Sequence, residues 1–234
     1  MLKKDLKVNF KYNKNPIKLV VRSENYKVSQ VLKAEYAVAF RRAIGMGVAT
    51  RASMSELLKR EGVWTEIDEE KLLQKTIGAG LLEVQLMTAE EEGLGVVAKQ
   101  IAFKLVNMRS EIYDLVKIKH EPLQHTAESI AEDVQLDNFI TLCTYDATNG
   151  KPYFRDHNDF LARRDDADAK KVYVAVIEEL SRDNFELIRN LPENKWLLEH
   201  KLIDKNGAAI SEEVLKLLED EEELEVVIGE DKAE

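Results

Sequence analysis

Residues 88–117 read TAEEEGLGVVAKQIAFKLVNMRSEIYDLVK, and this stretch decides the fold. Its apolar residues recur at spacings of three and four, and they are Leu94, Val97, Ile101, Leu105, Met108, Ile112 and Leu115. A repeat close to 3.5 residues is typical of a helix that packs along another helix. Thr88 followed by Glu91 matches a capping box and indicates the helix start. The sequence therefore predicts a helix over 88–117, about 45 Å long at 1.5 Å per residue, that needs a partner.

The partner expected from the sequence lies directly upstream. Residues 67–87 carry a second apolar stripe at helical spacing, made of Leu73, Ile77, Leu81, Val84 and Met87. The link at 88–93 is short, and short connections join antiparallel neighbours. We therefore expect an antiparallel helical hairpin, or a short antiparallel coiled coil, in which this stripe packs on the long helix.

The rest of the chain predicts helices and one small β element. Residues 6–12 and 17–22 are rich in β-branched and aromatic residues and flank an Asn-Lys-Asn-Pro turn, which predicts a β-hairpin. The expected fold is mainly α: a multi-helix bundle with a long antiparallel helical hairpin and a small N-terminal β-hairpin. The expected segments are a basic region 1–66, the α-hairpin 67–122, a helical domain 123–210, and an acidic helix and tail 211–234.

Composition narrows the class of protein. Of the 234 residues, 44% are hydrophobic and 33% are charged, a balance typical of a soluble protein with exposed helices. The N-terminal MLKKDLKVNF has no apolar core of a signal peptide, and no apolar run approaches the ~18 residues of a membrane span. Cys143 is the only cysteine, which excludes an intramolecular disulfide and favours a reducing cytoplasm.

Charge is distributed unevenly along the chain. Residues 1–60 hold 14 Lys/Arg against 4 Asp/Glu, whereas residues 201–234 hold 4 against 12. A basic head and an acidic tail can dock on each other or on partners. The alternative is an ordinary solvated surface followed by a disordered acidic end. The candidate interaction residues are Lys3, Lys4, Lys7, Lys11, Arg41, Arg42, Glu219, Asp220, Glu221, Glu222 and Glu223.

A nucleic-acid interface is a second interpretation of the basic region. Tyr12 and Tyr26 lie among its cations, and such a surface binds single strands by charge and stacking. The acidic tail would then cover this surface until nucleic acid displaces it. Against this interpretation, Tyr36 and Phe40 fall on the apolar face of a predicted helix, where aromatic residues pack in a core.

No catalytic constellation is visible in the sequence. Gly45-Met46-Gly47 lacks the spacing of a phosphate loop. The acidic residues of 156–168 resemble hard-cation ligands, but capping of helix N-termini accounts for them more simply. Cys143 falls on an apolar helix face, where a thiol is usually buried and inert. We therefore expect no enzyme, and no catalytic, cofactor-binding or metal-binding residues.

Three stretches carry a resemblance to a known group of proteins. They are AEYAVAFRRAIGMGVATRASMSELLKREGVWTE at 34–66, TLCTYDATNGKPYF at 141–154 and NLPENKWLLEHKLIDKNG at 190–207. Together they resemble uncharacterised proteins of tailed bacteriophages, especially T4-like phages of marine hosts, that are associated with virion morphogenesis. The resemblance implies a helical, non-enzymatic tail-assembly chaperone or virion structural component. It implies other phage structural or tail proteins as partners and a location in the infected host's cytoplasm or the virion. Self-association is a separate expectation, since the basic head of one chain can dock on the acidic tail of another.

Overall fold

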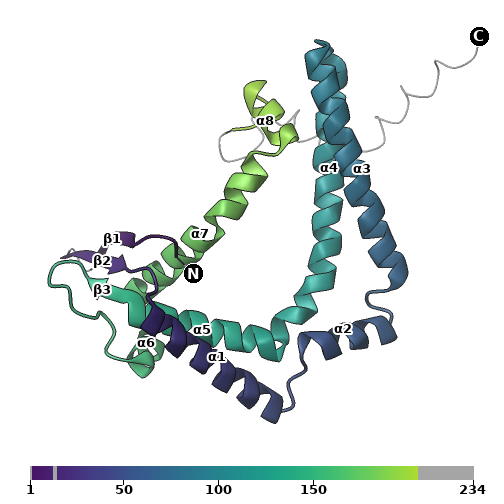
Figure 1. Ribbon diagram of the computed structural model, residues 1–234. Helices are drawn as coiled ribbons and strands as arrows, with labels where there is room; N and C mark the ends of the chain where they lie inside the picture. The colour runs from purple at the N-terminus through teal and green to yellow at the C-terminus, as the bar shows by residue number, and fades with distance from the viewer. Residues whose placement is uncertain (1, 13–14, 205–234) are drawn as a thin grey trace, which may run out of the picture. The chain divides into compact units, whose positions relative to one another are not determined.

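The protein is mainly helical, as the sequence predicts (Figure 1). The computed structural model describes residues 2–12 and 15–204. The expected acidic helix and tail at 211–234 therefore lie outside the described residues. The elements are β1 (Leu6–Tyr12), β2 (Asn15–Val21), α1 (Tyr26–Gly45), α2 (Arg51–Arg60), α3 (Glu66–Glu91), α4 (Gly95–His120), a 3-10 helix (Glu121–His125), α5 (Ala127–Cys143), β3 (Thr144–Asp146), α6 (His157–Arg163), α7 (Ala167–Arg189) and α8 (Pro192–Glu199).

The chain forms two compact units, each built from two separate stretches of sequence. Unit 1 comprises Met1–Arg60 and Glu121–Asn184, and unit 2 comprises Glu61–His120 and the described part of Phe185–Glu234. These units divide the chain differently from the expected segments. Residues 61–66, expected with the N-terminal region, belong to the same unit as the helical hairpin. The helical hairpin lies in unit 2, and the β-hairpin lies in unit 1.

The sheet of unit 1 begins with the predicted β-hairpin and gains a third strand. β1 and β2 pair antiparallel with Val8 opposite Leu19. β3 pairs antiparallel with β2, giving the order β1-β2-β3. α5 ends at Cys143, and the chain extends directly into β3. The Thr144 hydroxyl donates to the Ile140 carbonyl at 2.6 Å, which satisfies an acceptor at that helix end.

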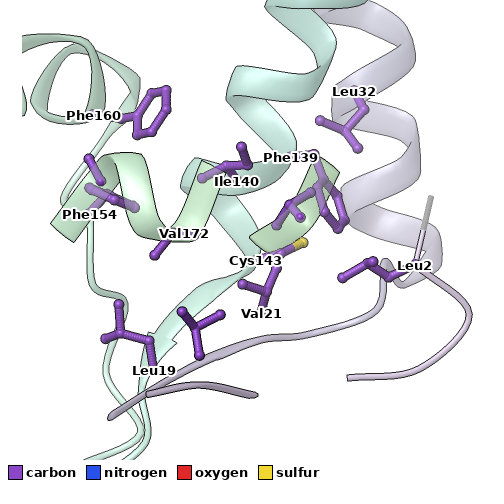
Figure 2. Close-up of a cluster of buried hydrophobic side chains, with 13 residues drawn as sticks. Leu2, Leu19, Val21, Leu32, Phe139, Ile140, Cys143, Phe154, Phe160 and Val172 are labelled. Carbon is purple, nitrogen blue, oxygen red and sulfur yellow. The ribbon is translucent and has the colours of Figure 1, made fainter. Parts of the chain in front are cut away.

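The core of unit 1 joins the inner face of this sheet to four helices (Figure 2). Alternate strand residues point inward, as the two-residue period of a strand requires. Phe154 and Phe160 meet edge to face with ring centroids 5.1 Å apart. Cys143 is buried here, as expected, and burial raises the pKa of its thiol to about 12. The main buried contributors are Val8, Leu19, Val21, Leu32, Phe139, Ile140, Cys143, Phe154, Phe160 and Val172.

Unit 2 is organised around the predicted helical hairpin. The first helix of the hairpin ends four residues later than expected, at Glu91 instead of residue 87. α3 runs from Glu66 to Glu91, and α4 begins at Gly95, so the predicted helix start at Thr88 is wrong. Thr88 instead belongs to the last turns of α3, and its hydroxyl donates to the Val84 carbonyl at 3.0 Å. Gly93 has a φ of +72°, a conformation that glycine adopts without steric cost. That residue reverses the chain between the two helices.

The two helices of the hairpin lie side by side and antiparallel (Figure 1). At the open end, Lys119 Nζ lies 2.8 Å from Glu69 Oε1, and further along Lys75 pairs with Glu111. A Cβ added at Gly78 would lie 3.3 Å from the sulfur of Met108, so this glycine permits close approach of the helices. Trp64 is buried at the corner before α3, and its Nε1 donates to Glu69 at 2.7 Å.

The face of α3 that packs on α4 differs from the predicted one. The predicted stripe of Leu73, Ile77, Leu81, Val84 and Met87 is exposed, and each of these side chains is more than half accessible to solvent. The buried seam of α3 instead contains Ala79, Leu86 and Ala89. On α4, Leu105 is buried while Ile101, Met108 and Ile112 pack against the cluster, so most of the predicted seam is correct. Leu94 and Val97, its first two members, are exposed.

The helix α8 covers one flank of the hairpin. Trp196, Leu197 and Ile203 join the same hydrophobic cluster as the seam residues of α3 and α4. Arg109 of α4 donates from Nε to Glu193 of α8 at 3.0 Å and also pairs with Glu83 of α3. In the described part of unit 2, α8 therefore fills the groove on one side of the hairpin.

Candidate functional site

An open groove lies on the hairpin near the turn that joins α3 to α4. Its volume is about 590 Å³. We call it the hairpin groove. Its walls are Leu82, Val84, Gln85, Thr88, Ala89 and Glu92 on the α3 side, and Leu94, Val97, Gln100, Ile101 and Lys104 on the α4 side. Among these lining residues, Glu92 and Lys104 are the charged ones, and the surface between them is chiefly apolar.

The hairpin groove and α8 lie on opposite flanks of the hairpin. Successive residues of a helix are about 100° apart, so Gln85 and Thr88 project about 140–160° away from Glu83. On α4, Lys104 projects about 140° away from Arg109 by the same geometry. Glu83 and Arg109 belong to the flank that α8 covers. The hairpin therefore has one groove filled by its own helix and one that is open among the described residues.

The exposed stripe of α3 continues the apolar wall of the hairpin groove. Val84 belongs to both, and Ile77 and Leu81 precede it at spacings of seven and three residues. Leu94, just before α4, and Val97 of α4 are exposed beside it. A contiguous exposed apolar surface of this kind usually marks a binding site. Hydrophobic periodicity predicts this stripe as the seam of α3, whereas it faces solvent.

The structure brings together two of the predicted interaction residues, Lys7 and Lys11. Both are exposed on the outer face of β1, since alternate residues share a face. Cross-strand pairing adds Lys18, which lies opposite Asn9. Arg22 follows β2, and its guanidinium lies 4.0 Å from the centre of the Tyr145 ring. Sequence reasoning missed Lys18, Arg22 and Tyr145 as parts of this basic sheet face, although the hairpin register identifies Lys18.

The other predicted interaction residues are not part of this sheet face. Lys3 is exposed and pairs with Asp183 of α7 at 2.5 Å. Arg41 and Arg42 are exposed near the end of α1, about 22 Å along that helix from its start at 1.5 Å per residue. Lys4 is exposed before β1. The acidic residues Glu219, Asp220, Glu221, Glu222 and Glu223 lie outside the described residues.

A buried carboxylate of unit 1, Asp168, joins α7 to α6 and to the segment before α6. Asp168 accepts hydrogen bonds from the Tyr153 hydroxyl and from Arg163 Nη2, the latter at 2.5 Å. Burial acts to raise the pKa of Asp168, but these hydrogen bonds outweigh it and lower that pKa overall. Burial and the hydrogen bond to Asp168 raise the pKa of Tyr153 to about 12. The three side chains form a charge-assisted clamp between the α6–α7 corner and the segment before α6.

The acidic residues that resemble cation ligands in the sequence have structural partners. Asp156 caps α6 by accepting from the Asp159 backbone N–H at 2.9 Å, and that hydrogen bond lowers the pKa of Asp156. Asp137 of α5, which lies outside residues 156–168, is buried, and burial raises its pKa although Arg164 lies 3.4 Å away. Within residues 2–12 and 15–204, no group of three or more His, Cys, Asp or Glu side chains is arranged to hold a metal ion.

Comparison with known proteins gives no relative for this chain. No protein-family model, curated protein or solved structure matches it. Across the described residues, none of the helices has the length and apolar character needed to cross a membrane. Function therefore has to be inferred from the surfaces themselves.

Proposed function

We propose that this protein is a non-enzymatic assembly protein of a tailed bacteriophage that binds an amphipathic helix of a partner in the hairpin groove. The observation that carries the proposal is the groove itself, an apolar surface on rigid paired helices with one acidic and one basic residue on its walls. From the start of α4 to Lys104 it follows about 14 Å of that helix, which matches roughly two to three turns of a bound helix. Helix-in-groove recognition uses this kind of surface.

The resemblance of the sequence to proteins of T4-like phages supplies the biological setting of the proposal. A tail-assembly chaperone must hold an apolar segment of a tail or baseplate protein before it is incorporated, and a structural component must hold one permanently. Either role requires an exposed apolar groove, and neither requires a catalytic centre. The protein would act in the cytoplasm of the infected host or in the virion, and its partners would be other phage structural or tail proteins.

The groove proposal predicts that a carboxylate placed among the apolar residues of either wall weakens partner binding. Val84→Asp and Val97→Asp should each weaken capture of the partner more than about tenfold, because the carboxylate would be desolvated against apolar side chains. The tagged full-length protein is expressed during infection, and captured proteins are identified by mass spectrometry. Val96→Asp is the matched control, since Val96 is exposed on α4 but does not line the groove.

The capture experiment can either support or contradict the proposed groove. Tail, baseplate or capsid proteins recovered with the parent and with Val96→Asp, but lost with both groove variants, would support the proposal. Recovery of no virion or tail protein by the parent would contradict it. Equal recovery by all the variants would place the binding surface elsewhere.

The basic sheet face favours a second candidate function, the binding of single-stranded nucleic acid. Lys7, Lys11 and Lys18 share this face, with Arg22 and Tyr145 at one end. Cations can neutralise phosphates, and an aromatic ring can stack on a base. In this alternative the acidic residues 219–234 would compete for the face and inhibit binding.

This alternative predicts salt-dependent binding that a charge reversal on the sheet removes. Fluorescence anisotropy with a labelled single-stranded oligonucleotide at low salt should show binding by the parent, and tighter binding by a chain lacking 219–234. Lys7→Glu combined with Lys18→Glu should remove it, whereas Lys71→Glu, on α3, should not. No binding by either the parent or the truncated chain would exclude this function.

A further inference from the structure

The two charged residues of the hairpin groove lie at its opposite ends. Glu92 is at the turn, just after α3. Gly78 lies level with Met108, since a Cβ added at Gly78 would be 3.3 Å from the Met108 sulfur. The helices are antiparallel, so about one helical turn further along α3, Leu82 lies level with Lys104 of α4. From Leu82 to Glu92 the chain rises about 15 Å at 1.5 Å per residue. The basic and acidic ends of the groove are therefore separated by nearly its whole length.

Neither charge is satisfied within its own chain. The side chains of Glu92 and Lys104 are exposed, and neither forms an ion pair with another described residue. Elsewhere on the hairpin, charged side chains join α3 to α4, as Lys75 does with Glu111. The surface between the two ends is chiefly apolar. An occupant that also satisfies the charges needs an apolar surface with a cation at the turn end and a carboxylate at the other.

A second copy of the chain meets this requirement. Consider a two-fold axis that passes midway between Glu92 and Lys104, at right angles to the line that joins them. It exchanges the two positions, so each Glu92 comes opposite Lys104 of the second copy. A two-fold interface is self-complementary in this way, and two-fold dimers are the commonest protein oligomers. The line between the two residues runs diagonally from α3 to α4, so the hairpins would cross obliquely, as packed helices commonly do.

The exposed apolar surface is also wider than the groove. Ile77, Leu81 and Met87 of α3 are each more than half exposed and lie outside the groove lining. A single bound helix covers a strip about 10 Å wide, whereas a second hairpin presents two helices. Pairing of two hairpins gives a four-helix arrangement in which each copy covers the apolar surface of the other. The width of the surface therefore favours a second copy as the occupant when no partner is bound.

We infer that two copies of this protein pair through their hairpin grooves about a two-fold axis when no partner is bound. Each Glu92 then pairs with Lys104 of the other copy, and the apolar walls cover each other. A partner helix must separate the two copies before it can bind, so self-association regulates access to the groove. The pairing stands on the charges and apolar surface of the groove, whereas the competition rests on the proposed function.

Charge reversal at the two ends of the groove tests the pairing in the full chain. Sedimentation velocity over a concentration series at low salt should show a reversible dimer of the parent. Glu92→Lys and Lys104→Glu, each studied alone, should weaken dimerisation at least about tenfold, since either change places two like-charged pairs in the interface. The matched controls are Asp114→Lys and Lys117→Glu, at exposed positions of α4 outside the groove, and they should leave dimerisation unchanged.

A mixture of the two single variants separates pairing from any effect within one chain. When Glu92→Lys is mixed with Lys104→Glu, each interface pair again joins a cation to a carboxylate, so a heterodimer should form with about the affinity of the parent. The chain that carries both substitutions should dimerise like the parent for the same reason. A monomeric parent, single variants that dimerise like the parent, an equal loss in the controls, or a mixture that recovers no dimer would each overturn the inference.

Failure of this inference is distinguishable from failure of the proposed function. If the dimer forms and no tail or virion protein is captured during infection, the pairing stands and the proposed function falls. If capture depends on Val84 and Val97 but the parent is a monomer, the inference falls and the function stands. If both hold, a second copy with a different tag should be absent from complexes that contain a captured phage protein. Its presence there would overturn the competition for the groove.

Discussion

Replacement of Leu105 by alanine is expected to lower the free energy of unfolding of unit 2 by about 2–5 kcal/mol. Leu105 is 0% exposed in the seam between α3 and α4. Truncation removes the transfer free energy of its side chain and leaves a cavity between two helices that also contact α8. The loss should appear as a lower urea midpoint. Both tryptophans, Trp64 and Trp196, belong to unit 2, so their fluorescence reports this unit specifically.

The matched control is the same substitution on the exposed stripe of α3. Leu81 is 61% exposed, so Leu81→Ala should change the free energy of unfolding by no more than about 0.5 kcal/mol. The sequence makes the two leucines look equivalent, since each belongs to an apolar stripe of a long helix. A similar loss for both variants would show that α3 packs through the Leu81 stripe and would contradict the structure.

The hairpin shows how far hydrophobic periodicity determines packing. α4 has one dominant apolar stripe, so the sequence identifies most of its seam correctly. α3 has two, and the bulkier stripe is the one that faces solvent. The buried stripe contains Ala79 and Ala89, and Gly78 allows Met108 to approach closely. Close packing of two helices favours small residues in the seam, which a ranking of residues by hydrophobicity overlooks.

The turn of the hairpin illustrates the same limit for capping signals. The pattern at Thr88 and Glu91 matches a capping box, but the capping box that the structure contains lies at Thr65 and Asp68, at the start of α3. The deciding signal was Gly93, whose positive φ ends one helix before the next begins. The capping pattern at Thr88 and the glycine at Gly93 favoured different turns. The packing of α3 along α4 selected the turn at Gly93.

Features that depend on distant segments could not be predicted. β3 forms because Val20 lies opposite Tyr145, more than 120 residues away. The hairpin groove depends on which stripe of α3 is buried and on α8 covering only one flank. By contrast, the shared face of Lys7 and Lys11 follows directly from the two-residue period of a strand. Arg41 and Arg42 share only their charge with these lysines. A basic stretch of sequence does not by itself show that its residues lie on one surface.

Loss of the Arg109 guanidinium, in Arg109→Met, is expected to destabilise unit 2 by about 3–5 kcal/mol. Glu193 is 1% exposed, and Arg109 donates to it from Nε at 3.0 Å while pairing with Glu83 on the other side. In Arg109→Met the packing of the aliphatic chain is largely kept. The carboxylate of Glu193, however, would be left buried without its partner, and desolvation of a lone charge is strongly unfavourable.

A double variant separates two contributions to stability: the penalty for burying the Glu193 charge alone, and the net stabilisation by the Arg109–Glu193 pair. Arg109→Met with Glu193→Met should recover most of the lost stability, because apolar residues of similar volume can replace a buried ion pair. Glu83→Gln removes the more exposed partner and should cost no more than about 1 kcal/mol. All variants are compared by urea denaturation followed by tryptophan fluorescence. The double variant could instead be as unstable as Arg109→Met alone. That result would show that Arg109 stabilises the hairpin through its own packing or through Glu83, and that the buried charge of Glu193 does not account for the loss of stability.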